Sequence, residues 1–453
     1  MQDATSLAAA IASGQVTAPM VMEASLAAAE READLGSIAR IDPAMGRAGA
    51  LEHNPGPFAG VPFLGKDLGS AARGFPIAAG SAALISRIKD PGHDSVLFSR
   101  FRTAGLVPFG LTTVPEFGLA LTSDPARNPF DHRLSPGGSS GDAAAAVAAG
   151  IVAIAHATDA AGSIRVPAAT CGLAGLKPSR GATPGGPDFN NHLMGLVSEL
   201  VVARSVRDVA TAFRLASGRA QGPSGDPLPL TMATPLRVAL CLPDRCGPAQ
   251  HAAARQAALA LQTLSAVVEE RPAPDEMGLA AIRIARTILT VSMAEWLDAF
   301  AITDGEVSPL SAAVAAEGRA MPATVLFAAS REMAQLSHAV WTMFDGIDIL
   351  LSPVLAGSPP ALGAFDMTST DLSSHFAQME ATAPNAALAN VAGCPALVLP
   401  FGTDEAGLPI GIQLMGPIGS DLALLDLGER LATLALPVRF PGTIAGIHDP
   451  AGP

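Results

Sequence analysis

The chain has 453 residues, of which 49% are hydrophobic and 15% are charged, so it can bury a large core and does not have the composition of a disordered protein. Its formal net charge is −13 and its Lys and Arg residues form no cluster, which excludes a typical nucleic-acid-binding protein. Four cysteines without a CxxC pair predict reduced thiols in a cytoplasmic protein, and the scattered histidines predict no metal site.

The first half of the chain predicts alternating helices and strands. Residues 5–34 are Ala-rich and predict two helices divided at Gly14, with Thr5 or Ser6 as the N-cap. PFAGVPFLGKD, from Pro57 onward, predicts strands with tight turns. Residues 96–110 and 142–159 each predict a helix, a glycine stop (Gly105 and Gly150) and then a strand, which favours an α/β architecture.

The second half predicts a helical insertion between further strands. PSGDPLPLTMATP leads to one strand, RVALCLP, and helical patterns then run from about 249 to 341. Strand-like segments return at 348–354, 395–402 and 408–416. We therefore expect a single interrupted domain spanning 1–453, with these parts in order: N-terminal helices 1–50, a catalytic core 57–217, a helical substrate-side region 218–345 and a C-terminal part of the sheet 346–453.

A Gly/Ser turn precedes the alanine run in LSPGGSSGDAAAAVAAG, residues 134–150. The simple interpretation is a helix entry capped by Ser140. The G-x-S-x-G pattern also occurs on the nucleophile turn of α/β-hydrolases, but the preceding RNPFDHRLSP makes a poor central strand.

Ser163 is better placed for chemistry, because it follows the strand 151–159 directly in TDAAGSIRVP. Such a turn can expose backbone N–H groups beside a hydroxyl, as an oxyanion hole requires; the alternative is a tight turn whose serine bonds its own backbone. His156 on the preceding strand is interpreted as a packed core histidine. Lys66 in VPFLGKDLG is either an ordinary surface charge or a buried base.

Taken together, these stretches resemble the amidase signature family of serine hydrolases over most of the chain. The stretches that carry the resemblance are PFAGVPFLGKD, DSVLFSRFRTAGLVPFGLTTVPEFG, RNPFD, SPGGSSG, TDAAGSIRVPAATCGLAGLKPSRG, DILLSPVLAG, NVAGCPALVLPFG and GLPIGIQLMG. The resemblance implies an α/β fold with a large twisted mixed sheet covered on both faces by helices. It also implies amide hydrolysis through a Ser–Ser–Lys triad without a cofactor.

The resemblance assigns roles by motif. Ser163 is the nucleophile, Ser139 the bridging serine, reached through a cis Gly138–Ser139 peptide, and Lys66 the base, whose apolar flank would lower its pKa by burial. The oxyanion donors are expected to be the backbone N–H groups of Ala160, Ala161, Gly162 and Ser163. The expected supporting residues are Gly138, Ser140, Asp159 and Arg165.

Two departures from the family pattern stand out. After GGSSG the family usually has glycine and serine, whereas this chain has Asp142 and Ala143; we interpret Asp142 as an acid suited to the helix macrodipole. Before GS the family has a bulky residue and a glycine, whereas this chain has Ala160 and Ala161. Ala161 would be strained if its φ were positive.

The substrate side is expected in residues 117–122, 185–196 and the helices of 290–345, which carry few charges. Its expected residues are Phe117, Gly118, Leu119, Phe189, Leu193, Met194, Trp296 and Trp341. They favour a neutral, fairly apolar amide, anilide or carbamate, and hence an amidase with aryl acylamidase, esterase and urethanase activity. The alternatives are a glutaminase subunit of a tRNA-dependent amidotransferase and an inactive binding module, the latter suggested by Ala160 and Ala161.

The expected partners follow from the same features. They are a small-molecule amide or carbamate and, at most, a second copy of the chain in a homodimer. No nucleic acid is expected, and no membrane, because the longest apolar run, residues 143–155, is too short to cross a bilayer.

Overall fold

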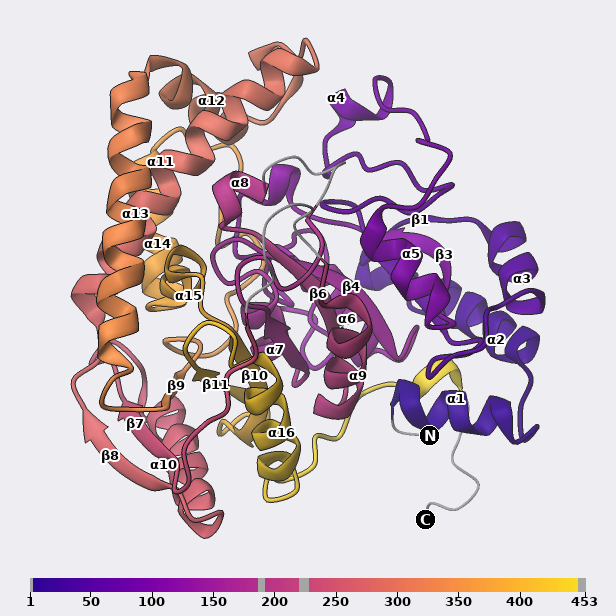
Figure 1. The fold of residues 1–453 in the computed structure, drawn as a ribbon. Coiled ribbons are helices and arrows are strands. Elements are labelled where there is room, and N and C mark those ends of the chain that lie inside the picture. Colours follow the sequence, from indigo (N-terminus) through magenta and orange to yellow (C-terminus); the bar gives the residue numbers. More distant parts are fainter. Residues whose placement is uncertain (1–2, 186–191, 220–227, 447–453) are drawn as a thin grey trace.

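The computed structural model describes residues 3–185, 192–219 and 228–446. Within these residues, eleven strands form one mixed sheet in the order β1-β3-β2-β4-β6-β5-β10-β11-β9-β7-β8, flanked by helices (Figure 1). The strands are β1 (Ile38–Ile41), β2 (Pro62–Lys66), β3 (Val107–Thr112), β4 (Ile154–Asp159), β5 (Ala174–Lys177), β6 (Ser198–Ala203), β7 (Arg237–Cys241), β8 (Val267–Arg271), β9 (Ile349–Pro353), β10 (Ala396–Thr403) and β11 (Pro409–Met415). The predicted fold class is confirmed.

The α-helices are α1 (Ala4–Ala12), α2 (Ala18–Arg31), α3 (Pro43–Leu51), α4 (Ala82–Ile85), α5 (Val96–Thr103), α6 (Gly141–Ala148), α7 (Arg165–Thr170), α8 (His192–Gly195), α9 (Val206–Ala216), α10 (Pro248–Thr263), α11 (Asp275–Ala299), α12 (Pro309–Ala320), α13 (Ala323–Met343), α14 (Leu372–Thr382), α15 (Ala386–Ala392) and α16 (Asp421–Ala432). Short 3-10 turns are η1 (Ala33–Leu35), η2 (Glu116–Gly118), η3 (Asp304–Glu306) and η4 (Ile444–Gly446).

The sheet brings distant parts of the chain side by side. Strand β2 pairs in parallel with both β3 and β4, so the carboxyl ends of β2 and β4 lie at the same edge. Strands β9, β10 and β11, which follow the helical insertion, join strands that precede it, because β10 pairs with β5. The sheet is therefore continuous across both halves of the sequence, as the strand pattern predicts.

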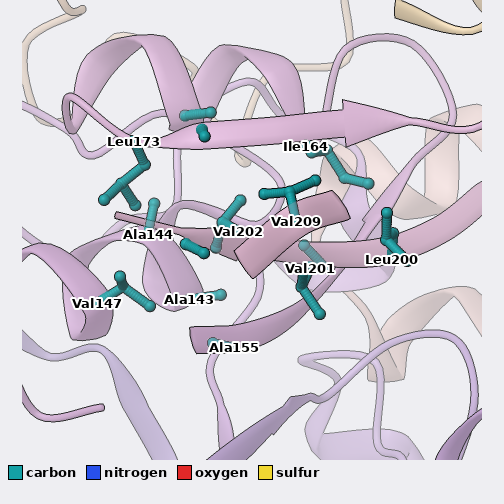
Figure 2. Close-up of a cluster of buried hydrophobic side chains, with 14 of the residues drawn as sticks. Ala143, Ala144, Val147, Ala155, Ile164, Leu173, Leu200, Val201, Val202 and Val209 are labelled. Carbon is teal, nitrogen blue, oxygen red and sulfur yellow. The ribbon is translucent and has the colours of Figure 1, made fainter. Parts of the chain in front are cut away.

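The core explains the alanine run. All eight residues of α6 are buried, and so are all residues of β4 and β6. Figure 2 shows Ala143, Ala144 and Val147 of α6 in one apolar cluster with Ala155 of β4 and Val202 of β6. Side chains this small let a fully buried helix lie close to the sheet, and a helix whose side chains are apolar on every side except at Asp142 belongs in a core.

Several boundaries differ from the sequence predictions. The strand predicted for 151–159 begins only at Ile154, because the chain first reverses at Gly150 (φ +79°) after α6. The predicted N-cap at Thr5 or Ser6 is wrong, because Asp3 caps α1. The Asp3 carboxylate accepts from the backbone N–H of Ser6, and the Ser6 hydroxyl accepts from the backbone N–H of Asp3, which completes a capping box. Strands β1, β5, β6 and β8 were not predicted, since they are short or lack a clear alternation of apolar residues.

Among the described residues, α11 is the one helix long and apolar enough to cross a membrane, judged by length and composition alone. It packs against α12, α13 and α15, and 44% of its most apolar window is buried. These contacts fit a helix of the protein core, and one of its faces borders the cavity described next.

Candidate functional site

Lys66 is the last residue of β2 and is fully buried, so the interpretation as a surface charge is wrong. Its Nζ donates to three hydroxyls, those of Ser139 at 2.9 Å, Ser140 at 2.8 Å and Thr158 at 2.9 Å. Burial lowers the pKa of Lys66 to about 7, against the opposing effect of the nearby carboxylates. An amine that is half deprotonated near neutral pH can accept a proton from one of these hydroxyls.

Ser139 and Ser140 sit where the chain enters α6, and the Gly138–Ser139 peptide is cis, as the resemblance implies. Gly138 is required there, because a Cβ would lie 2.5 Å from the carbonyl oxygen of Thr122. Ser140 makes no side-chain cap on α6, so the capping interpretation is wrong. Its hydroxyl instead accepts from Lys66 and donates to the carbonyl of Thr158 at 3.1 Å, which braces the lysine against β4.

The loop that carries Ser163 is organised by Asp159, the last residue of β4. The Asp159 carboxylate accepts from the backbone N–H of Gly162 at 2.7 Å and from Arg165 Nε at 2.9 Å. Burial would raise the pKa of Asp159, but the paired guanidinium of Arg165 outweighs it and holds that pKa well below its usual range. Arg165 is itself buried and also donates to Asn390 and Gln413, so a saturated polar network fixes the turn.

The backbone of this turn corrects two expectations. Gly162 donates its N–H to Asp159, so it does not point a free donor at a substrate; among the described residues, the N–H groups of Ala160, Ala161 and Ser163 have no acceptor. The residue with positive φ is Gly162 (φ +117°) and not Ala161. The predicted strain at Ala161 is therefore absent, and three backbone donors remain beside the Ser163 hydroxyl.

Ser163 and Ser139 border one cavity of about 510 Å³, measured with its opening to solvent. The Ser163 hydroxyl makes no hydrogen bond to a described residue, so it does not bond its own turn. The described lining contains no charged side chain and consists of Leu68, Phe117, Gly118, Leu119, Ser139, Thr158, Ala160, Ser163, Leu193, Val197, Leu289, Ser292, Met293 and Trp296. Five of the residues expected on the substrate side therefore line this cavity: Phe117, Gly118, Leu119, Leu193 and Trp296.

The other three residues expected there, Met194, Trp341 and Phe189, are not among the described residues that line the cavity. Trp341 on α13 does not line this cavity: it is 64% exposed and borders a separate hollow with Leu230 and Phe344. Met194 is half-buried and packs near the cavity without lining it. Phe189 lies outside the described residues.

Sequence reasoning missed the pair behind Lys66. His156 Nδ1 accepts the backbone N–H of Lys66 at 3.3 Å, and its Nε2 lies 2.9 Å from Glu199 Oε2, with both side chains fully buried. Glu199 also accepts from the backbone and hydroxyl of Ser70. The pair links β2, β4 and β6. The sequence feature that could have revealed it is the placement of His156 and Glu199 inside buried strands, β4 and β6.

Comparison with known proteins places this geometry in context. The family model described as Amidase matches residues 22–425. The chain is 32% identical to the 6-aminohexanoate-cyclic-dimer hydrolase of Paenarthrobacter ureafaciens, over 95% of this chain and 94% of that one. It is 31% identical to the putative amidase AmiB2 of Mycobacterium tuberculosis, over 93% of each.

Solved structures give the same picture. The structure of a 6-aminohexanoate cyclic dimer hydrolase complexed with substrate superposes with a TM-score of 0.90 at 28% identity, covering 98% of this chain and 99% of that chain. The crystal structure of a bacterial aryl acylamidase shares the fold, with a TM-score of 0.82 at 24% identity over 99% of both chains.

Proposed function

Because this chain belongs to the amidase signature family of amide-cleaving hydrolases, we propose that it cleaves neutral, largely apolar amides through an acyl-enzyme on Ser163. The observation that carries the proposal is the buried Lys66, whose amine meets the hydroxyl of Ser139 at the wall of the cavity that Ser163 also lines. Each later step of the proposed reaction uses Lys66, Ser139, Ser163 or the backbone N–H groups of the turn that carries Ser163.

The proposed reaction begins with Lys66 as a neutral amine. An ordinary lysine, with a pKa of about 10.4, is neutral in roughly one of a few thousand molecules at pH 7. With its pKa lowered to about 7, Lys66 is neutral in about half of them. It accepts the proton of Ser139, which in turn accepts that of Ser163 as the Ser163 oxygen attacks the amide carbonyl.

The same groups complete the cycle. The N–H groups of Ala160, Ala161 and Ser163 are available to the developing oxyanion, and losing one such donor typically costs about 10²–10³ in rate. The relay then returns the proton to the departing nitrogen, so the amine leaves neutral. Water hydrolyses the acyl-enzyme by the same route.

The lining supports a neutral substrate. Its described side chains are apolar apart from hydroxyls, so an ionised group would lose its water without gaining a counter-charge. The compound in the relatives' names, a cyclic dimer of 6-aminohexanoate, is a neutral molecule with two amide bonds and no ionised terminus, and it matches this character. We extend the proposal to anilides, carbamates and activated esters, whose carbonyls need the same donors.

The alternatives are less well supported. Glutamine carries two ionised groups, for which the described lining offers no partner, so a glutaminase role is disfavoured. The inactive module was suggested by Ala160 and Ala161, and neither residue has the positive φ that would strain the turn. The four cysteines are buried free thiols, which supports the proposed cytoplasmic location.

The test is covalent trapping. We expect wild-type protein incubated with a neutral nitroanilide to release the aniline and to gain the mass of the acyl group on Ser163, read by mass spectrometry of peptides. Ser163→Ala should lose the adduct and at least about 10⁴ in kcat. Ser292→Ala, a hydroxyl deletion in the same cavity, is the matched control and should keep the adduct; full turnover by Ser163→Ala defeats the proposal.

A further inference from the structure

Asp142 is a buried carboxyl in the first turn of α6, two residues after Ser140. The residue has no exposed surface, and neither of its oxygens has a hydrogen-bond partner among the described residues. The hydroxyls of Thr113 and Ser123 lie beside the carboxyl, but neither makes a hydrogen bond of ordinary geometry with it. A carboxylate in such surroundings is costly unless it is protonated or faces a cation.

The surroundings of α6 identify that cation. The helix packs against β2, β3, β4, β6 and α7. The titratable and charged groups on these elements and directly after them are Lys66, Asp67, His156, Asp159, Arg165, Cys171, Glu199 and Arg204. Asp67 accepts from the backbone N–H groups of Ala78 and Gly80, and Arg204 donates to the carbonyls of Val147 and Ala148 at the opposite end of α6. His156 and Glu199 bond each other, and Arg165 is held by Asp159.

Lys66 is the cation of this set that lies at the same end of α6 as Asp142, since its Nζ bonds the hydroxyl of Ser140. Its Nζ bonds hydroxyls and no carboxylate, and Asp142 is the foremost charge that opposes its loss of a proton. Lys66 in turn lowers the pKa of Asp142, against the dominant effect of burial. Burial thus moves the two pKa values toward each other, that of Asp142 up to about 7 and that of Lys66 down to about 7.

We propose that Asp142 is a positioning residue that sets the charge of Lys66, the two side chains holding a single proton between them around neutral pH. In one form Lys66 is an ammonium and Asp142 a carboxylate; in the other Lys66 is a neutral amine and Asp142 a carboxylic acid, and this second form is competent for catalysis. The proton lost by Lys66 is balanced by the proton gained by Asp142, so no net charge is buried in either form. The inference rests on the proposed role of Lys66 as base.

This arrangement predicts a specific pH profile. An ionised Asp142 stabilises the ammonium and so raises the pKa of Lys66, while a protonated Asp142 does not. The acid limb of kcat/KM in the wild type is therefore spread over two proton-loss steps that belong to the pair. Removing the carboxylate leaves one step, and that step lies at lower pH by about one unit.

The test uses Asp142→Asn and Asp142→Gly. The first keeps the shape of the side chain, and the second restores the residue type that the family usually has here and so guards against a failure to fold. Both should shift the acid limb to lower pH and sharpen it to a single step. A limb that stays in place in a folded variant, with activity kept or lowered uniformly at all pH values, overturns the proposal.

Asp421→Asn is the matched control. Asp421 is also a buried acid in the first turn of a helix, α16, with its pKa raised by burial, but it accepts hydrogen bonds from Ser179, and the lysine that opposes this rise is Lys177 and not Lys66. Its replacement should leave the acid limb where the wild type has it. A shift in this control as large as that in Asp142→Asn also overturns the proposal.

A readout independent of turnover separates this inference from the proposed function. Infrared difference spectra of ¹³C-aspartate-labelled wild type and Asp142→Asn should show one protonated carboxyl band at neutral pH that only the wild type has, and it should disappear as the pH rises. Its absence at pH 6–7 overturns the inference even in an active enzyme. Its presence in a protein that forms no acyl-enzyme leaves the shared proton standing and refutes the proposed function alone.

Discussion

Two buried lysines end two strands of the same sheet, Lys66 on β2 and Lys177 on β5, and burial lowers the pKa of each to about 7. They differ in their partners. Lys66 meets three hydroxyls next to a cavity, whereas Lys177 donates to the carbonyl oxygen of Pro178 at 2.6 Å. A hydroxyl can give up a proton and a carbonyl cannot, so a lowered pKa alone does not mark a catalytic base.

The largest expected effect separates these two lysines. Lys66→Met should lower kcat/KM for a neutral nitroanilide by about 10³ or more, because general-base catalysis and the return of the proton to the leaving nitrogen are both lost. For a nitrophenyl ester the loss should be smaller, since that leaving group needs no proton. Steady-state rates on both substrates measure the difference.

Lys177→Met supplies the comparison. Its kcat/KM should stay within about tenfold of the wild type, and its free energy of unfolding should fall by about 1 kcal/mol with the lost hydrogen bond to Pro178. Urea denaturation measures the stability. If Lys66→Met and Lys177→Met lost activity equally, the difference between hydroxyl and carbonyl partners would not distinguish a catalytic lysine from a structural one.

The pH profile sharpens the comparison in the wild type. Only the neutral form of Lys66 accepts a proton, so the rate should rise with pH through about 7 and then level off. At pH 5 about 1% of a group with a pKa of 7 is neutral, which predicts a rate on the order of a hundredfold below the plateau. Measurements of kcat/KM between pH 5 and 9, with circular dichroism to verify folding, test this.

In Lys177→Met, the rise of kcat/KM with pH should occur at the same pH as in the wild type. A flat wild-type profile would remove Lys66 from the role of base. If the acid limb of kcat/KM shifted in Lys177→Met, Lys177 and not Lys66 would be the group that titrates. The distinction between the two lysines by their hydrogen-bond partners would then fail.

Much of the site could be predicted from the sequence, but only through the ordered set of motifs. Taken singly, Lys66 resembles a surface charge and Ser139 a helix entry. What brings them together is topology: β2 and β4 are parallel neighbours, so Lys66 and Thr158 arrive at the same edge, where α6 begins. The family resemblance supplies that topology in advance, whereas periodicity supplies only the separate elements.

What could not be predicted depends on pairings between distant residues. The contact of His156 with Glu199 requires β4 beside β6, and β6 was not recognised as a strand. The burial of Asp142 was missed because an acid in the first turn of a helix is usually solvated and complements the helix dipole. Which tryptophan borders the cavity depends on which helix faces it, and neither α11 nor α13 shows that in its own pattern.

The smallest expected effect concerns those two tryptophans. Trp296 on α11 lines the cavity and stacks at a tilt near Phe117, with 6.4 Å between ring centroids, whereas Trp341 on α13 is exposed beside another hollow. Trp296→Ala should raise KM for a neutral anilide up to about tenfold, because an aromatic wall of the apolar pocket is lost. Trp341→Ala, the matched control, should change KM less than about twofold. If Trp341→Ala had the larger effect, the substrate would lie on the far side of α13, away from Ser163, and the assignment of the cavity to the same site as Lys66 would fail.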